Sequence, residues 1–174
     1  MAVHAQDPAG SGKSQLARER AAVREAARAA EFEEAIAAAA RGDLRGAEAS
    51  LSRGPDQRPS SVAAELERAS RLGQVALSLR QRGHDEAAHA IAVLALSKLE
   101  GIRPQQLAAS APAVRAQVWQ AIGLVQERML FDLAAARAAY LQAQRDYPEA
   151  PGAKAGLKRL NDEETKRTRF SQKG

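Results

Sequence analysis

The sequence predicts an all-α protein built from antiparallel helical hairpins, and three observations support this fold class. Alanine, the best helix former, makes up roughly a quarter of the residues. Apolar residues recur at steps of three and four, and no segment alternates with the period of two that marks a strand. Glycine and proline fall between the periodic segments, where they end helices. We therefore expect helices and no sheet.

These signals predict a single helical domain over residues 14–165. A polar lead-in without an apolar period precedes it and is predicted to be disordered, and a basic tail predicted to be flexible follows it. From the N-terminus, the predicted parts are the lead-in 1–13, hairpins at 14–54, 61–100 and 111–148, a closing helix at 151–165, and the tail 166–174.

In the first hairpin, a long alanine-rich helix from Ser14 to about Ala40 precedes a short helix from Leu44 to Arg53. Ser14 is a candidate N-cap, and Gly42 is a stop signal for the long helix. Asp43 can cap the short helix through its carboxylate.

The second hairpin shows one buried face on each helix. Ser61 begins its first helix, Gly83 ends that helix, and Gly101 ends the second. The apolar stripe of the first helix comprises Val62, Leu66, Ala69, Leu72, Val75 and Leu79. The second helix follows His84-Asp85, and its apolar stripe comprises Ala88, Ile91, Ala92, Ala95 and Leu99.

A third hairpin follows a short helical turn predicted at Pro104–Ala109. Ser110 and Pro112 mark its start, and Pro148 closes it. Its stripes are Val114, Val118, Ile122, Val125 and Met129, then Leu133, Ala136, Tyr140, Ala143 and Tyr147. The closing helix turns Leu157 and Leu160 inward, and its charged continuation beyond Asn161 is expected to fray.

The third hairpin resembles a tetratricopeptide repeat. The positions that carry the resemblance are Trp119, Ile122, Gly123, Ala136, Tyr140, Ala143 and Pro148. One extra residue lies in the turn near Phe131, where glycine is usual. The second hairpin matches the repeat pattern at Leu72, Val75, Ala76, Gly83, Ala88 and Ala95, but it has Ala92 where the pattern has an aromatic residue. The first hairpin matches the pattern only at Gly42, Ala47 and Leu51.

This resemblance implies a short right-handed superhelix whose concave groove, built from the first helix of each hairpin, binds a peptide or helical segment of another protein. The groove lining is mostly neutral and rich in amides, so a clamp for a terminal carboxylate is not predicted. The positions that the resemblance assigns to the groove are Ser70, Leu77, Arg80, Gln81, Gln117, Gln120, Leu124, Glu127 and Arg128. We therefore expect a non-catalytic interaction scaffold.

An alternative function uses the long N-terminal helix for self-association in a structural or envelope-associated assembly. Its alanine-rich face and the stripe formed by Arg20, Arg24 and Arg28 motivate this hypothesis. The same stripe is also interpreted as a solvated face relieved by Glu25 and Glu31, or as a surface for an acidic partner.

No residue pattern predicts catalysis, a cofactor, a metal or a nucleotide. The chain has no cysteine, and His84 and His89 are five residues apart, on different faces of a helix. The segment from Gly10 to Ser14 resembles a phosphate-binding loop, but it has Asp7 in place of the first glycine and lacks a preceding strand. It is interpreted as a flexible linker.

The distribution of charge and of apolar residues bears on whether the protein binds nucleic acid, spans a membrane or is exported. Residues 151–174 contain seven basic and three acidic residues, which accounts for +4 of the net charge of +5. This segment has only one aromatic residue on which a base could stack, so nucleic-acid binding is not favoured. No apolar stretch approaches the ~20 residues that span a bilayer. The chain as it stands predicts a cytoplasmic protein; export is the alternative if Ala2–Ala5 is the remnant of a signal peptide.

Overall fold

The computed structural model describes residues 9–52 and 61–171, and every regular element within them is helical. The prediction of an all-α fold is confirmed. The elements are α1 (Ala9–Ala40), α2 (Leu44–Leu51), α3 (Val62–Gln81), α4 (Asp85–Glu100), α5 (Pro104–Ala108), α6 (Pro112–Val125), the π-helical turn η1 (Gln126–Leu130), α7 (Leu133–Asp146) and α8 (Pro151–Ser171).

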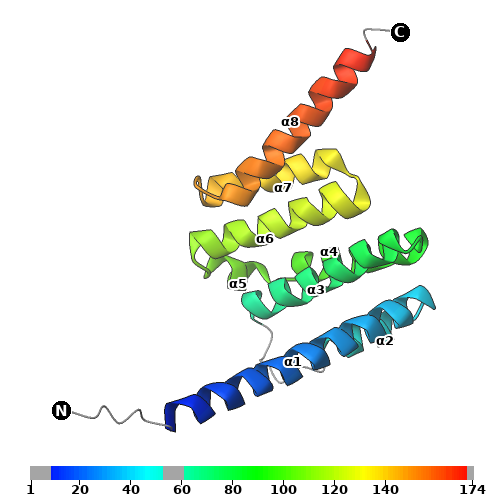
Figure 1. The fold of residues 1–174 in the computed structure, drawn as a ribbon. Coiled ribbons are helices and arrows are strands. Elements are labelled where there is room, and N and C mark those ends of the chain that lie inside the picture. The colour runs from blue at the N-terminus through cyan, green and yellow to red at the C-terminus, as the bar shows by residue number, and fades with distance from the viewer. Residues whose placement is uncertain (1–8, 53–60, 172–174) are drawn as a thin grey trace, which may run out of the picture.

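The helices pair into successive hairpins, α1 with α2, α3 with α4 and α6 with α7, and α8 follows as a last single helix (Figure 1). The first helices of successive hairpins contact one another in the order α1, α3, α6, α8. The second helix of each hairpin also contacts the first helix of the next. The main contacts therefore join neighbouring units along one line.

Several helix boundaries follow from the predicted capping residues. The Asp43 carboxylate accepts a hydrogen bond of 2.8 Å from the Gly46 amide, and the Ser61 hydroxyl accepts one of 3.2 Å from the Ala64 amide. Gly42 and Gly83 have φ angles of +82° and +81°, the left-handed conformation that ends a helix with little strain in glycine. These local predictions are confirmed.

Both terminal helices are longer than predicted. α1 begins at Ala9, so Ser14 lies inside it rather than at its cap, and the predicted Gly10–Ser14 linker is helical. α8 continues through Asn161 to Ser171 instead of fraying. Local bonds along the exposed turns support this continuation, among them an ion pair of 3.2 Å between Lys166 and Glu163. Residues 1–8 of the predicted lead-in and 172–174 of the predicted tail lie outside the described residues. The short second helix was predicted to end at Arg53, which also lies outside the described residues; in the structure this helix, α2, ends at Leu51.

Two clusters of buried residues form the core. The larger runs from the second half of α1 through α4, α6 and η1, and the smaller surrounds Tyr140 between α6, α7 and α8. Most predicted stripe positions are buried, whereas Val62, Leu66, Val114 and Leu133 are partly buried. Tyr147 is the exception at 41% exposed, because the backbone is extended where α7 ends.

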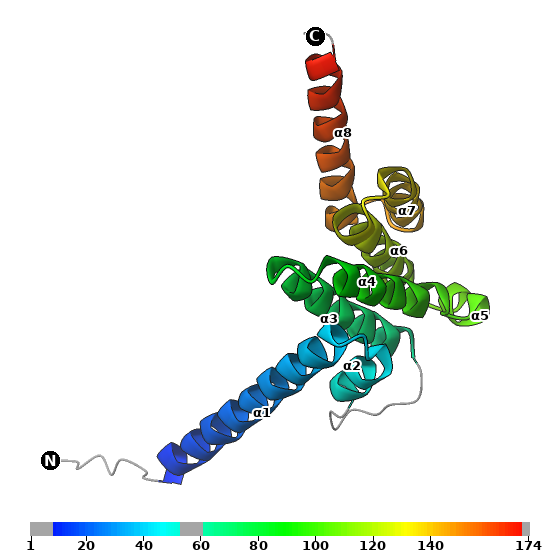
Figure 2. The same cartoon turned by 90° about the vertical axis from the view of Figure 1, so that its right-hand side faces the viewer.

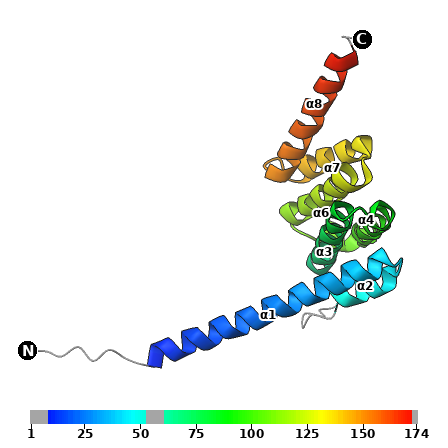
Figure 3. The same ribbon diagram turned by 45° about the vertical axis from the view of Figure 1, so that its right-hand side comes forward.

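The first half of α1 stands away from the rest of the protein (Figures 2 and 3). Residues 17–30 are all exposed, and the helix becomes buried only from Ala35 onward. None of the helices in the described ranges combines the length and the apolar character needed to cross a membrane.

Candidate functional site

The junction between α6 and α7 contains a π-helical turn. The Gln126 carbonyl accepts hydrogen bonds from the Phe131 amide and, at 3.0 Å, from the Asp132 amide. This wide turn lies where the tetratricopeptide resemblance predicted one extra residue. Phe131 itself has a φ of +59°, a left-handed conformation that is uncommon for an aromatic residue, and its side chain is 65% exposed.

Arg80 from α3 supports this turn. Its guanidinium donates hydrogen bonds to the carbonyls of Arg128, at 3.0 Å, and Met129, at 2.9 Å. The same group lies over the Phe131 ring, 4.7 Å from its centroid, which is a favourable distance for a cation–π contact. Arg80, predicted to line the groove, is therefore engaged within the chain, where it links α3 to the turn and orients the exposed ring.

Tyr140 joins three helices at the end of the stack. Its side chain is fully buried. A Cβ added at Gly123 of α6 would lie 2.7 Å from its Cε1 atom, and a Cβ added at Gly156 of α8 would lie closer still to Cε2. Glycine at both positions thus allows α6 and α8 to approach opposite edges of the ring. This packing fixes α8 beside the turn.

A polar network continues from Tyr140 to the surface. The Tyr140 hydroxyl donates a hydrogen bond of 2.6 Å to Glu127 Oε2. Arg159 of α8 donates from Nε to Oε1 and from Nη2 to Oε2 of Glu127, each at 2.7 Å. Both carboxylate oxygens of Glu127, a predicted groove residue, are therefore engaged within the chain, and η1, α7 and α8 are held together.

This network shifts the ionisation of two of its members. Hydrogen bonds from Arg159 first, and from Tyr140 to a lesser degree, hold the pKa of Glu127 below its ordinary value against the opposing effect of burial. Burial first, and then the Glu127 carboxylate, raise the pKa of Tyr140. Glu127 is thus held ionised and Tyr140 neutral at pH 7.

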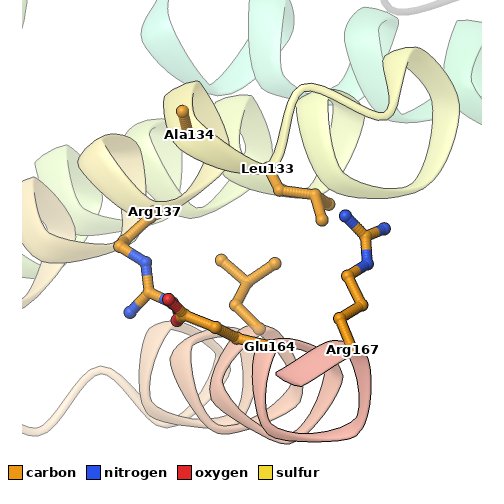
Figure 4. A pocket seen from close by; sticks show the side chains of 6 residues that line it. Leu133, Ala134, Arg137, Glu164 and Arg167 are labelled. Carbon is orange, nitrogen blue, oxygen red and sulfur yellow. The ribbon is translucent and has the colours of Figure 1, made fainter. Parts of the chain in front are cut away.

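Two open depressions lie beside this network and share Leu133, Leu160 and Arg167. The larger, of about 460 Å³, brings α3, η1, α7 and α8 together and is lined by Leu77, Glu127, Arg128, Phe131, Leu133, Arg159, Leu160, Glu163 and Arg167. The smaller, of about 230 Å³, lies between α7 and α8. In Figure 4, Arg137 meets Glu164 on one side of the smaller depression, and Arg167 extends toward Leu133 on the other.

The structure gathers three of the predicted groove residues, Leu77, Glu127 and Arg128, at the larger depression. Gln120 lies against Gly152 near the start of α8. The remaining positions line neither depression: Leu124 is 38% exposed, and Ser70, Gln81 and Gln117 are also exposed. The predicted set therefore divides between the depression, intrachain contacts and open surface.

Sequence reasoning missed Phe131 and the contribution of α8. The tetratricopeptide resemblance predicted one extra residue near Phe131, but residue spacing alone does not predict a π-helical turn there. Gly156 was a usable signal, since a glycine within a helix often marks a close approach. Arg167 belongs to the basic tail noted in the sequence, but no local pattern places it or Arg159 at this depression, because their neighbours in space come from distant segments.

The predicted basic stripe lies on the exposed half of α1. Arg20, Arg24 and Arg28 are exposed and form no ion pair with another residue of the described ranges. Glu31, expected to relieve them, instead pairs with Arg71 of α3 at 3.1 Å. The interpretation of the stripe as a relieved face thus loses one of its two acids.

Within residues 9–52 and 61–171, no group of three or more histidine, aspartate or glutamate side chains is arranged to hold a metal ion. His84 and His89 are both exposed. No protein-family model, curated protein or solved structure matches this chain.

Proposed function

We propose that the chain is a non-catalytic protein-interaction scaffold of the tetratricopeptide type, which binds a peptide or helical segment on the face formed by α3, η1 and α8. The order of contacts among α1, α3, α6 and α8 supports this proposal, because such stacking places the first helices side by side. In this proposal the stack is a right-handed superhelix, and the larger depression is the binding end of its groove.

The single observation that carries the proposal is the state of Phe131. A left-handed backbone costs a residue other than glycine roughly 1–2 kcal/mol, and a ring that is 65% exposed recovers little of this by burial. Arg80 nevertheless holds the ring beside Leu77 and Arg128 at the depression. Strained and exposed aromatic side chains are typical of binding sites.

Replacing Phe131 with glycine is expected to separate binding from stability. Glycine relieves the strained φ, which offsets the lost contact with Arg80, so the free energy of unfolding should stay within about 1 kcal/mol of wild type. Affinity for the partner should fall by roughly 10-fold or more, since aromatic anchors dominate interface energies. Urea denaturation and calorimetric titration measure the two quantities.

Finding the partner is the first step of this test. A photo-crosslinking amino acid at position 131 should join the partner covalently, whereas the same group at Val93, 46% exposed on α4, should not. The identified protein is then titrated against the purified wild-type chain and the Phe131→Gly variant. Equal affinities for the two chains would rule out this face as the binding site.

A second candidate function is self-association through α1 in a structural assembly. The observation that favours it is the exposure of all residues from 17 to 30, since an isolated helical segment of this length is marginally stable in water without a partner. Sedimentation should then detect a dimer or larger species that disappears when Val23, 69% exposed, is changed to glutamate. A monomer throughout would exclude this function.

A further inference from the structure

Two of the charged residues around the larger depression have no ion-pair partner in the described part of the chain. Glu127 is paired with Arg159, and Glu163 with Lys166. Arg128, whose charge helps to lower the pKa of the neighbouring Glu127, and Arg167 are both exposed, and neither side chain forms an ion pair or hydrogen bond within contact distance in the described part of the chain. Two guanidinium groups thus remain available at this depression.

The surface beside these arginines is apolar. Leu77 comes from α3, Leu133 from α7 and Leu160 from α8, and the exposed Phe131 ring lies at the same depression. Burying an apolar ligand group on this surface is favourable. Carboxylates are the natural partners of unpaired guanidinium groups, since two N–H donors of arginine match the two oxygens.

We propose that the ligand of this depression is an acidic peptide segment in which carboxylates pair with Arg128 and Arg167 and an apolar side chain packs against Leu133, Leu160 and Phe131. The inference rests on the proposed scaffold function and specifies its ligand. Charge complementarity favours this ligand over a neutral or basic segment. Because Glu127 and Arg159 already pair with each other, the ligand carboxylates would pair with Arg128 and Arg167.

The test uses a phage-displayed library of random peptides of about 12 residues, selected on the full chain at about 50 mM salt, where exposed charges are weakly screened. Selected peptides should be enriched in aspartate or glutamate next to leucine, phenylalanine or tryptophan. Their affinity, measured by fluorescence polarisation, should fall as salt is raised to about 500 mM.

The decisive variant is Arg128→Glu/Arg167→Glu, which should weaken binding of these peptides by roughly 10-fold or more at low salt. The matched control is Arg103→Glu/Lys158→Glu. It makes the same change in net charge at two exposed residues, one of them also on α8, outside both depressions. The control should bind within about 2-fold of wild type. Circular dichroism of both variants checks that the helices are retained.

The outcomes separate the two proposals. Selected peptides without acidic residues, or equal losses in the two double variants, would overturn the acidic ligand while leaving the scaffold function standing. A library that yields no binder would count against both. Arginine-dependent binding of a short single-stranded DNA, without binding of acidic peptides, would replace the peptide with a phosphate ligand and overturn this inference.

Discussion

Replacing Tyr140 with alanine should destabilise the protein by about 3–5 kcal/mol, the range measured for large buried aromatic residues. The ring is fully buried between Gly123 and Gly156, and neither glycine has a side chain that can fill the space left behind. Total stabilities of domains are about 5–15 kcal/mol, so this single change removes a large part. Urea denaturation followed by circular dichroism and by the fluorescence of Trp119, the only tryptophan and a neighbour of this cluster, measures the loss.

Two matched variants distinguish the causes of that loss. Tyr147→Ala makes the same chemical change at a position that is 41% exposed, and it should cost less than about 1 kcal/mol. Tyr140→Phe keeps the ring and removes only the hydroxyl that donates to Glu127, at an expected cost of about 1 kcal/mol. If Tyr140→Ala cost no more than Tyr147→Ala, the three-helix junction would not be the stabilising element described above.

Replacing Glu127 with glutamine should cost about 2 kcal/mol at pH 7 and progressively less at acidic pH. Glu127 is 11% exposed and Arg159 is 39% exposed, so the cost is smaller than for a fully buried pair. The folded-state pKa of Glu127 lies below the value of 4.5 that the unfolded state retains. Its contribution is therefore complete above about pH 4.5 and is lost as pH falls through the lowered pKa.

The measurement compares urea denaturation of wild type and Glu127→Gln at pH 7 and pH 3. The difference between the two proteins should shrink toward acidic pH, because glutamine does not titrate. Glu163→Gln serves as the control, since Glu163 is 52% exposed in its pair with Lys166 and should contribute little at either pH. A difference between wild type and Glu127→Gln that is equal at both pH values would mean that the carboxylate charge does not stabilise the fold.

Elements governed by local rules could be predicted from the sequence. Asp43 and Ser61 cap helices because their side-chain oxygens reach amides three residues onward. Gly83 ends α3 because glycine adopts a positive φ with little strain. The lengths of α1 and α8 were underestimated, since exposed polar helices lack the apolar period on which boundary prediction depends.

The candidate site was predictable only in part. Leu77, Glu127 and Arg128, which the tetratricopeptide resemblance assigned to the groove, line the larger depression. Arg159 was missed because it meets Glu127 across 32 residues of sequence, and no spacing rule encodes such a pair. The orientation of Phe131 depends on the π-helical turn and on Arg80, 48 residues before the Arg128 carbonyl that it bonds.

The linear order of contacts between neighbouring hairpins has a consequence for how the chain acquires its structure. Most native contacts form within a hairpin or with the next unit, so little chain entropy is lost in closing long loops. Topologies of this kind have low contact order and fold rapidly. We therefore expect folding to begin within a hairpin, such as the closely packed α3–α4 pair, and to extend to the neighbouring units.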